Sequence, residues 1–172
     1  MLLRRWILAA ASIALAGCTA RIGTDDHTER LTPEQRKQVE NDVRSFAARV
    51  AQDITQEGPA AWNKEFAESP SFFMAAEGKL AFPDRATATK VIADLAKTIP
   101  HIELHWGDDL RVDALTEDLA MVASSWHEMQ VDKEGHRVEE KGFFTGIAEK
   151  RSGKWQFRNA HWSSEAPAAK AP

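Results

Sequence analysis

The sequence predicts a single α+β domain, because apolar residues follow a helical period as far as Pro100 and a strand period after it. The chain has 172 residues, which is enough for one ordinary domain and too few for two. Its composition, 43% hydrophobic and 28% charged, is typical of a globular protein. A single cysteine excludes an intramolecular disulfide, so an apolar core must supply the stability.

The first expected helix begins after Thr32. Residues 32–35 combine an N-cap threonine, a proline at the first helical position and a glutamine three residues after the cap. The helix ends at Gly58-Pro59, where the sequence changes to residues that stop a helix. Its apolar stripe, spaced by three and four residues, consists of Val39, Val43, Phe46, Val50 and Ile54.

Two shorter helices are expected next. The first covers residues 59–69, where Trp62 and Phe66 lie four residues apart and share one face. The second begins at an N-cap, Asp84, and ends at Pro100. Its expected inward-facing residues are Ala88, Val91, Ile92, Leu95 and Ile99.

The remaining segments predict strands. Residues 71–82 form two short apolar runs around the turn Glu77-Gly78, which is typical of a hairpin. After Pro100 the β-rich segments are separated by turn signals and predict long antiparallel strands. These segments cover residues 101–115, 119–132, 138–150 and 154–164.

Three stretches within residues 33–164 carry a family resemblance: AWNKEFAESPSFFMAAEGKL, TGIAEKRSGKWQF and NAHWSS. In this order they resemble the nuclear transport factor 2-like superfamily, most closely its SnoaL-like branch. GKWQ followed by His-x-Ser also resembles the association domain of calmodulin-dependent kinases. The resemblance implies a cone-shaped domain in which three N-terminal helices pack on a strongly curved, mostly antiparallel mixed β-sheet. A pocket is then expected inside the cone.

The N-terminal stretch is typical of a secretion signal. Two arginines precede an apolar run of about eleven residues, which is too short to cross a membrane but normal for a signal peptide. Residues 15–18, LAGC, resemble the lipobox of bacterial lipoproteins. We therefore expect Cys18 to be acylated and to anchor the protein to the lipid bilayer, with an ordinary cleaved signal peptide as the alternative.

This interpretation divides the chain into four parts. Residues 1–17 are the expected signal peptide, 18–31 a tether, 32–165 the SnoaL-like domain and 166–172 a loose tail. Thr19, rather than aspartate, follows the cysteine, which resembles the sorting pattern for the outer membrane. The expected location is therefore the bacterial cell envelope, on the outer membrane and facing the periplasm.

Charge and spacing argue against several partners. The 22 basic and 26 acidic residues give a net charge of −4, so nucleic acid is not an expected partner. His101, Glu103 and His105 alternate along one strand, but the two histidines would stand about 13 Å apart, too far to share a metal ion. We expect no metal and no cofactor.

The resemblance also allows the catalytic residues of related enzymes to be compared with this chain. Around FAESPSFFM the chain resembles ketosteroid isomerase, whose general-base aspartate falls at Met74 here, and a thioether cannot accept a proton at neutral pH. That enzyme and scytalone dehydratase also use a tyrosine, and this chain has none. Catalysis of either kind is therefore not favoured.

The expected pocket lies on the concave face of the sheet. In the last strand, alternation places His161 on one face with Trp155, Phe157, Asn159 and Ser163, and the resemblance implies that this face is the concave one. The expected pocket residues are Trp62, Phe66, Phe73, Trp126, Phe144 and His161. Core packing explains the same residues equally well.

Three functions are compatible with this pocket. The leading hypothesis is binding of a small, largely apolar ligand, or self-assembly into a homodimer through the outer face of the sheet. The alternative is an isomerase, dehydratase or hydrolase that uses His161 with Glu77 or Glu128. Glu77 beside Gly78 is more simply a solvated turn residue, and Glu128 on its strand is more simply a surface-facing one. The third is a structural partner for another envelope protein.

Overall fold

The computed structural model describes residues 31–165. The expected signal peptide, Cys18, the tether before Leu31 and the tail after Glu165 lie outside the described residues. Within the described part, three α-helices and seven strands form one α+β domain, as expected. The strands are ordered across the sheet as β2 (Lys79–Phe82), β1 (Phe73–Ala76), β7 (Lys154–Ser164), β6 (Arg137–Arg151), β5 (Leu119–Val131) and β3 (His101–Trp106), with β4 (Arg111–Ala114) also paired to β5. All pairs are antiparallel except β1 with β7.

Helix α1 (Pro33–Glu57) begins and ends where the sequence predicts. The hydroxyl of Thr32 accepts a hydrogen bond from the Gln35 backbone N–H at 3.2 Å, and the Gln35 side chain accepts one from the Thr32 N–H at 2.8 Å. These two bonds satisfy donors that the first helical turn leaves free. At the other end Gly58 adopts φ 74°, a conformation that glycine reaches without strain.

Helix α2 (Trp62–Glu65) is shorter than expected. It follows a single 3₁₀ turn, η1 (Pro59–Ala61), and ends before Phe66. The chain leaves the helix because Phe66 forms a bridge with Phe157 and the Ala67 N–H donates to the Phe157 carbonyl at 2.9 Å. Pairing with a strand distant in sequence thus overrides the helical pattern up to residue 69.

An ion pair between a buried glutamate and a partly exposed arginine joins α2 to α1. The Glu65 side chain is fully buried, and its Oε2 lies 3.2 Å from Nη2 of Arg49. The same Arg49 nitrogen donates to the Trp155 carbonyl at 3.3 Å. Burial raises the pKa of Glu65, and the Arg49 charge opposes that rise. The pair therefore links the two helices, and Arg49 also links them to β7.

The first hairpin and α3 follow the expected pattern. Strands β1 (Phe73–Ala76) and β2 (Lys79–Phe82) meet at a turn in which Glu77 and Gly78 both have positive φ, 49° and 72°. Helix α3 (Arg85–Thr98) starts at Asp84, whose Oδ1 accepts from the Thr87 N–H at 2.7 Å. The sequence signals for both elements are local, which is why they predict the structure well.

The long strands form most of the sheet. They are β3 (His101–Trp106), β4 (Arg111–Ala114), β5 (Leu119–Val131), β6 (Arg137–Arg151) and β7 (Lys154–Ser164). The expected strand at residues 101–115 is split by a turn at Asp109. The Asp109 carboxylate accepts hydrogen bonds from the backbone N–H of Ser125 at 2.9 Å and from the Ser125 hydroxyl at 2.8 Å. Strands β3 and β4 consequently pair with different halves of β5.

Strand β7 contains a β-bulge that reverses its faces. Ala148 of β6 pairs with Phe157, whereas the adjacent Ile147 pairs with Asn159, so Arg158 is an extra residue. In a regular strand, residues on the same face are separated by an even number of positions. Here Phe157 before the bulge and Ala160 after it are both buried although they are three positions apart. The inward-facing series therefore continues through Trp162 instead of His161.

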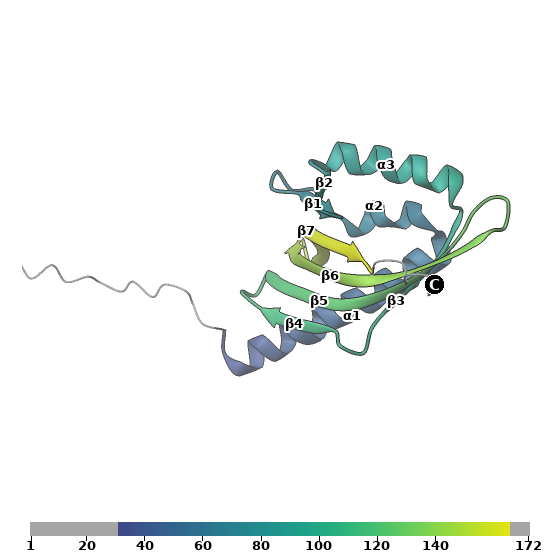
Figure 1. Cartoon of the computed structure of the whole chain (residues 1–172). Helices are drawn as coiled ribbons and strands as arrows, with labels where there is room; N and C mark the ends of the chain where they lie inside the picture. The colour runs from purple at the N-terminus through teal and green to yellow at the C-terminus, as the bar shows by residue number, and fades with distance from the viewer. Residues whose placement is uncertain (1–30, 166–172) are drawn as a thin grey trace, which may run out of the picture.

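The helices cover the concave face of the sheet. Helix α1 packs beside β3 and β4, and the Trp106 indole N–H donates to the Ala47 carbonyl at 2.8 Å. Phe46 and Phe157 join helix and sheet with ring centroids 4.7 Å apart. Figure 1 shows α3 on the opposite side of the molecule from β4, with the tip of the β5–β6 hairpin beside the C-terminal end of α3. No helix in residues 31–165 is long and apolar enough to span a membrane.

Candidate functional site

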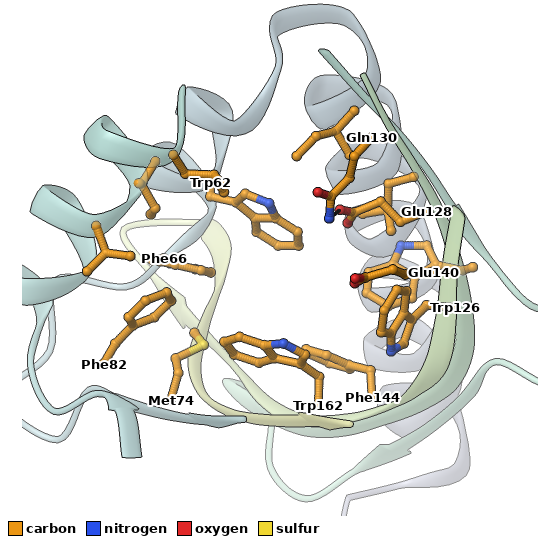
Figure 2. A pocket seen from close by; sticks show the side chains of 16 residues that line it. Trp62, Phe66, Met74, Phe82, Trp126, Glu128, Gln130, Glu140, Phe144 and Trp162 are labelled. Atoms are coloured by element: carbon orange, nitrogen blue, oxygen red, sulfur yellow. Dashed lines mark hydrogen bonds between the residues drawn. The ribbon is translucent and has the colours of Figure 1, made fainter. Parts of the chain in front are cut away.

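A cavity of about 210 Å³ lies between α3, the first hairpin and the concave face of the sheet. Its walls are mostly aromatic and aliphatic, and three polar side chains lie at one end (Figure 2). The lining residues are Trp62, Phe66, Met74, Phe82, Val91, Ile92, Leu95, Ile102, Leu104, Trp106, Trp126, Glu128, Gln130, Glu140, Phe144 and Trp162. The cavity explains why Val91 and Leu95 remain partly exposed although α3 turns them toward the sheet.

The aromatic walls are packed against one another. The Phe66 ring lies 5.4 Å from that of Trp62 and 6.2 Å from that of Phe82, measured between centroids. Phe82 in turn lies 5.8 Å from Trp162. Rings at these separations support each other. They form a wall held by α2, β2 and β7, so the cavity persists without a ligand to shape it.

Met74 occupies the wall where the resemblance to ketosteroid isomerase places a general base. Its side chain is only 1% exposed and faces the cavity beside Phe82 and Trp162 (Figure 2). A thioether offers a soft, adaptable surface but no proton acceptor at neutral pH. Abstraction of a substrate proton at this position is therefore excluded.

The polar end is formed by β5 and β6. Glu128 and Glu140 are directly paired across the two strands, and Gln130 lies two residues along from Glu128 on the same face. The Gln130 side-chain amide donates to Glu128 Oε1 at 2.7 Å. Figure 2 shows these three side chains on the wall opposite Phe66 and Phe82.

Glu128 is the ionisable group most altered by the cavity. Burial raises the pKa of Glu128, the amide of Gln130 lowers it and the charge of Glu140 raises it further. The net pKa is above the ordinary value of glutamate. Glu128 can therefore accept or release a proton, or bind a positively charged or hydrogen-donating group.

Trp126, another residue of the wall, carries an unpaired buried nitrogen. Its side chain is 8% exposed, and its indole N–H has no hydrogen-bond partner among residues 31–165. Buried donors are normally satisfied, because leaving one unpaired costs about 1–3 kcal/mol. The indole N–H is closed off from solvent as well, so it stays unpaired within the wall.

Four of the six expected pocket residues line the cavity: Trp62, Phe66, Trp126 and Phe144. Phe73 and His161 do not. His161 is exposed on the convex face of the sheet, because the bulge at Arg158 shifts the alternation by one residue. Phe73 is 46% exposed on the same convex face, because its neighbour Met74 faces inward and adjacent strand residues alternate.

The other candidate side chains lie outside the cavity. Glu77 occupies the β1–β2 turn, where its carboxylate accepts a hydrogen bond from the Ser164 backbone N–H. His101 contacts Glu103 at 3.3 Å, while His105 stacks on His127 across the strands. In the described part of the chain no group of three or more His, Cys, Asp or Glu residues is placed to hold a metal ion.

Sequence reasoning missed most of the polar end of the cavity. The two-residue spacing of Trp126, Glu128 and Gln130 was a usable signal, since alternate residues of a strand share a face. Glu140 had the same signal, since it lies four residues from Phe144 on one strand. Its position directly opposite Glu128 depends on the register between β5 and β6, which only the folded sheet defines.

Comparison with known proteins gives similarity in structure but not in sequence. No family model and no curated protein matches the chain. A nuclear transport factor 2-like superfamily protein from Salmonella enterica serovar Typhimurium has a TM-score of 0.64 at 15% identity, with 78% of this chain and 96% of that one covered.

Two further solved structures agree. A calcium/calmodulin-dependent protein kinase II association domain candidate from Xanthomonas campestris has a TM-score of 0.60 at 18% identity, covering 73% of this chain and 87% of that one. A scytalone dehydratase candidate from Novosphingobium aromaticivorans has a TM-score of 0.61 at 14% identity, covering 77% and 94%. The chain therefore has the nuclear transport factor 2-like fold, as its hairpin and last strand predict.

Proposed function

We propose that the protein binds a small, largely apolar molecule inside the cone. The observation that carries this proposal is the cavity of about 210 Å³, with aromatic walls from several elements and polar groups at one end only. Small-molecule sites have this character, and drug-sized ones occupy roughly 300–1,000 Å³. The ligand is therefore smaller than a typical drug.

Tryptophan fluorescence offers a direct test, because Trp62, Trp126 and Trp162 line the cavity. The full chain is titrated with three probes that share one apolar body: 4-phenylbutylamine, 4-phenylbutanol and 4-phenylbutyrate. We expect a saturable change with at least one probe. If none of the three produces one, the binding proposal is wrong.

A matched pair of variants locates the site. Leu95→Trp narrows the cavity from α3 and is expected to weaken binding at least about tenfold. Leu115→Trp introduces the same side chain at an exposed position away from the cavity and is the control. Equal weakening by both variants would place binding elsewhere.

A second candidate function is acid–base catalysis by Glu128. The observation that favours it is the raised pKa of this carboxyl group in an apolar cavity, an environment that general acids and bases use. The alternative pairing with His161 or Glu77 is removed, because neither side chain lines the cavity. A substrate turned over by the wild type and by Glu139→Gln, but not by Glu128→Gln, would favour catalysis.

We further propose that the domain is tethered to the outer membrane of a bacterial cell, facing the periplasm, through an acylated Cys18. The support is the lipobox-like LAGC at residues 15–18, with the chain's one cysteine at its last position. Labelling with a fatty acid should mark the wild type and not Cys18→Ser. Equal labelling of both would contradict the anchor.

A further inference from the structure

The two ionisable side chains that line the cavity are both carboxylates, and a cation in contact with its wall, Arg85, lies over the Phe66 ring at 5.9 Å without itself lining the cavity. Glu128 and Glu140 line the cavity, and no lysine, arginine or histidine within residues 31–165 does so. Glu139, the neighbour of Glu140, faces the other side of the sheet, where its carboxylate lies 3.7 Å from Nε2 of His127. The concave face of the β5–β6 hairpin is therefore acidic where it meets the cavity.

The two cavity carboxylates lie opposite each other across the strand pair and repel each other. Residues directly paired across antiparallel strands have Cβ atoms about 5 Å apart, and like charges there are unfavourable. The Gln130 amide supplies Glu128 with one hydrogen bond but no charge. A cation between Glu128 and Glu140 would relieve this repulsion, whereas an anion would increase it.

The aromatic walls favour the same sign. The faces of tryptophan and phenylalanine rings attract organic cations, and tryptophan does so most strongly. Trp62 and Trp162 surround the space that Glu140 enters in Figure 2. Aromatic faces combined with carboxylates form the chemistry that recognises ammonium groups and leaves the attached hydrocarbon in an apolar environment.

We propose that the cavity binds small organic cations, with an ammonium group held between Glu128 and Glu140 and an apolar body among Trp62, Phe66, Phe82 and Trp162. This assignment rests on the proposed binding function and names its ligand class. It excludes fatty acids and other amphiphilic anions as preferred ligands. A neutral alcohol retains the apolar contacts but lacks the charge.

The three phenylbutyl probes separate these cases near neutral pH, where the amine is protonated and the carboxylic acid is ionised. We expect the ammonium probe to bind at least about tenfold more tightly than the alcohol, and the carboxylate to bind most weakly. If the alcohol or the carboxylate binds as tightly as the ammonium, the proposal is wrong but the binding function stands. If no probe binds, the binding function itself fails.

A double variant tests whether the two glutamates cause the preference. In Glu128→Gln/Glu140→Gln the advantage of the ammonium over the alcohol should fall below about threefold, while the alcohol keeps its affinity within about threefold. The alcohol thus reports whether the variant is folded with an intact cavity. Glu139→Gln removes one negative charge from the adjacent position on the convex face and should retain the preference. Persistence of the full preference in the double variant would overturn the proposal.

Discussion

Which face of the sheet a residue occupies decides what it can do in this protein. His161 and Trp162 are adjacent, yet Trp162 lines the cavity and His161 is exposed on the convex side. Glu128 faces the cavity and has a raised pKa, while the adjacent His127 points to the convex face and pairs with Glu139. Chemical type alone therefore does not identify the functional residues.

Replacing His161 with alanine should change neither stability nor binding. The imidazole is exposed on the face of the sheet opposite the cavity, so we expect a free energy of unfolding within about 0.5 kcal/mol of wild type. Thermal melting and the phenylbutyl titrations check both parts. A lower affinity in His161→Ala would mean that this histidine reaches the ligand after all.

Glu128→Gln should stabilise the protein in a pH-dependent way. Because burial raises the native pKa of Glu128, the native state binds its proton more tightly than the unfolded state does. The stability that Glu128 contributes to the wild type is therefore fully present below the pKa of this group in the unfolded state. It is lost as the pH rises through the pKa of the group in the native state. Glutamine does not titrate, so we expect the Tm of Glu128→Gln to exceed that of the wild type by about 2 °C near neutral pH.

The pH dependence supplies the check on that explanation. The difference in Tm should close below about pH 4, where the carboxyl group is protonated in both states. Glu139→Gln, at an exposed position, should show no such closing gap. A difference between Glu128→Gln and wild type that stays constant with pH would rule out titration of Glu128 as its cause.

At the scale of elements, long-range pairing changed what local pattern predicts. Helix α2 ends at Glu65 because Phe66 and Ala67 pair with Phe157. The segment after Trp106 turns because the Asp109 carboxylate accepts a hydrogen bond from the Ser125 backbone N–H. The bulge at Arg158 has the largest effect on the site. It turns Trp162 into the cavity while Trp155 and Phe157 stay in the core.

Deleting Arg158 should therefore disrupt the domain. Without the extra residue, either Trp155 and Phe157 or Ala160 and Trp162 must face the convex side, so we expect a loss of at least about 3 kcal/mol. Arg158→Ala keeps the residue count and should cost less than about 1 kcal/mol. Chemical denaturation followed by tryptophan fluorescence compares the two. Similar stabilities would show that the bulge does not set the faces of β7.

At the scale of the whole molecule, the concave and convex faces have separate roles. The cavity lies under the helices, whereas Phe73, Met121 and Phe143 are exposed on the convex face, where Phe73 and Met121 border a shallow groove with His161. Apolar side chains gathered on one face indicate an interaction surface. The homodimer expected from the sequence would use this face and leave the cavity free.

We predict a dimer that Phe143→Lys disrupts. A stable interface buries roughly 1,200 Å² or more, and two lysines brought together by two-fold symmetry would repel each other. Light scattering should give twice the chain mass for wild type and a single chain for the variant. The phenylbutyl titrations should be unchanged in the variant, since Phe143 is exposed on the face of the sheet opposite the cavity. A monomeric wild type at high concentration would contradict the dimer.

The sequence alone determined the features that depend on neighbours along the chain. The capping box at Thr32 and Gln35, the apolar stripe of α1 and the Glu77-Gly78 turn act over a few residues, so the α+β class and most element positions could be predicted. Trp62, Trp126 and Phe144 lie on regular stretches of helix or strand and line the cavity, and Phe66, the residue that follows α2, lines it as well.

The tertiary structure decided the features that depend on pairing between distant segments. The bulge opposite Ile147 and Ala148 places Trp162, instead of His161, on the cavity face. The register between β5 and β6 places Glu140 beside Glu128. A shift of one residue in a strand moves every later side chain to the opposite face. The pairing of the two cavity carboxylates therefore followed from the hydrogen-bond register between strands, a property that no short stretch of sequence contains.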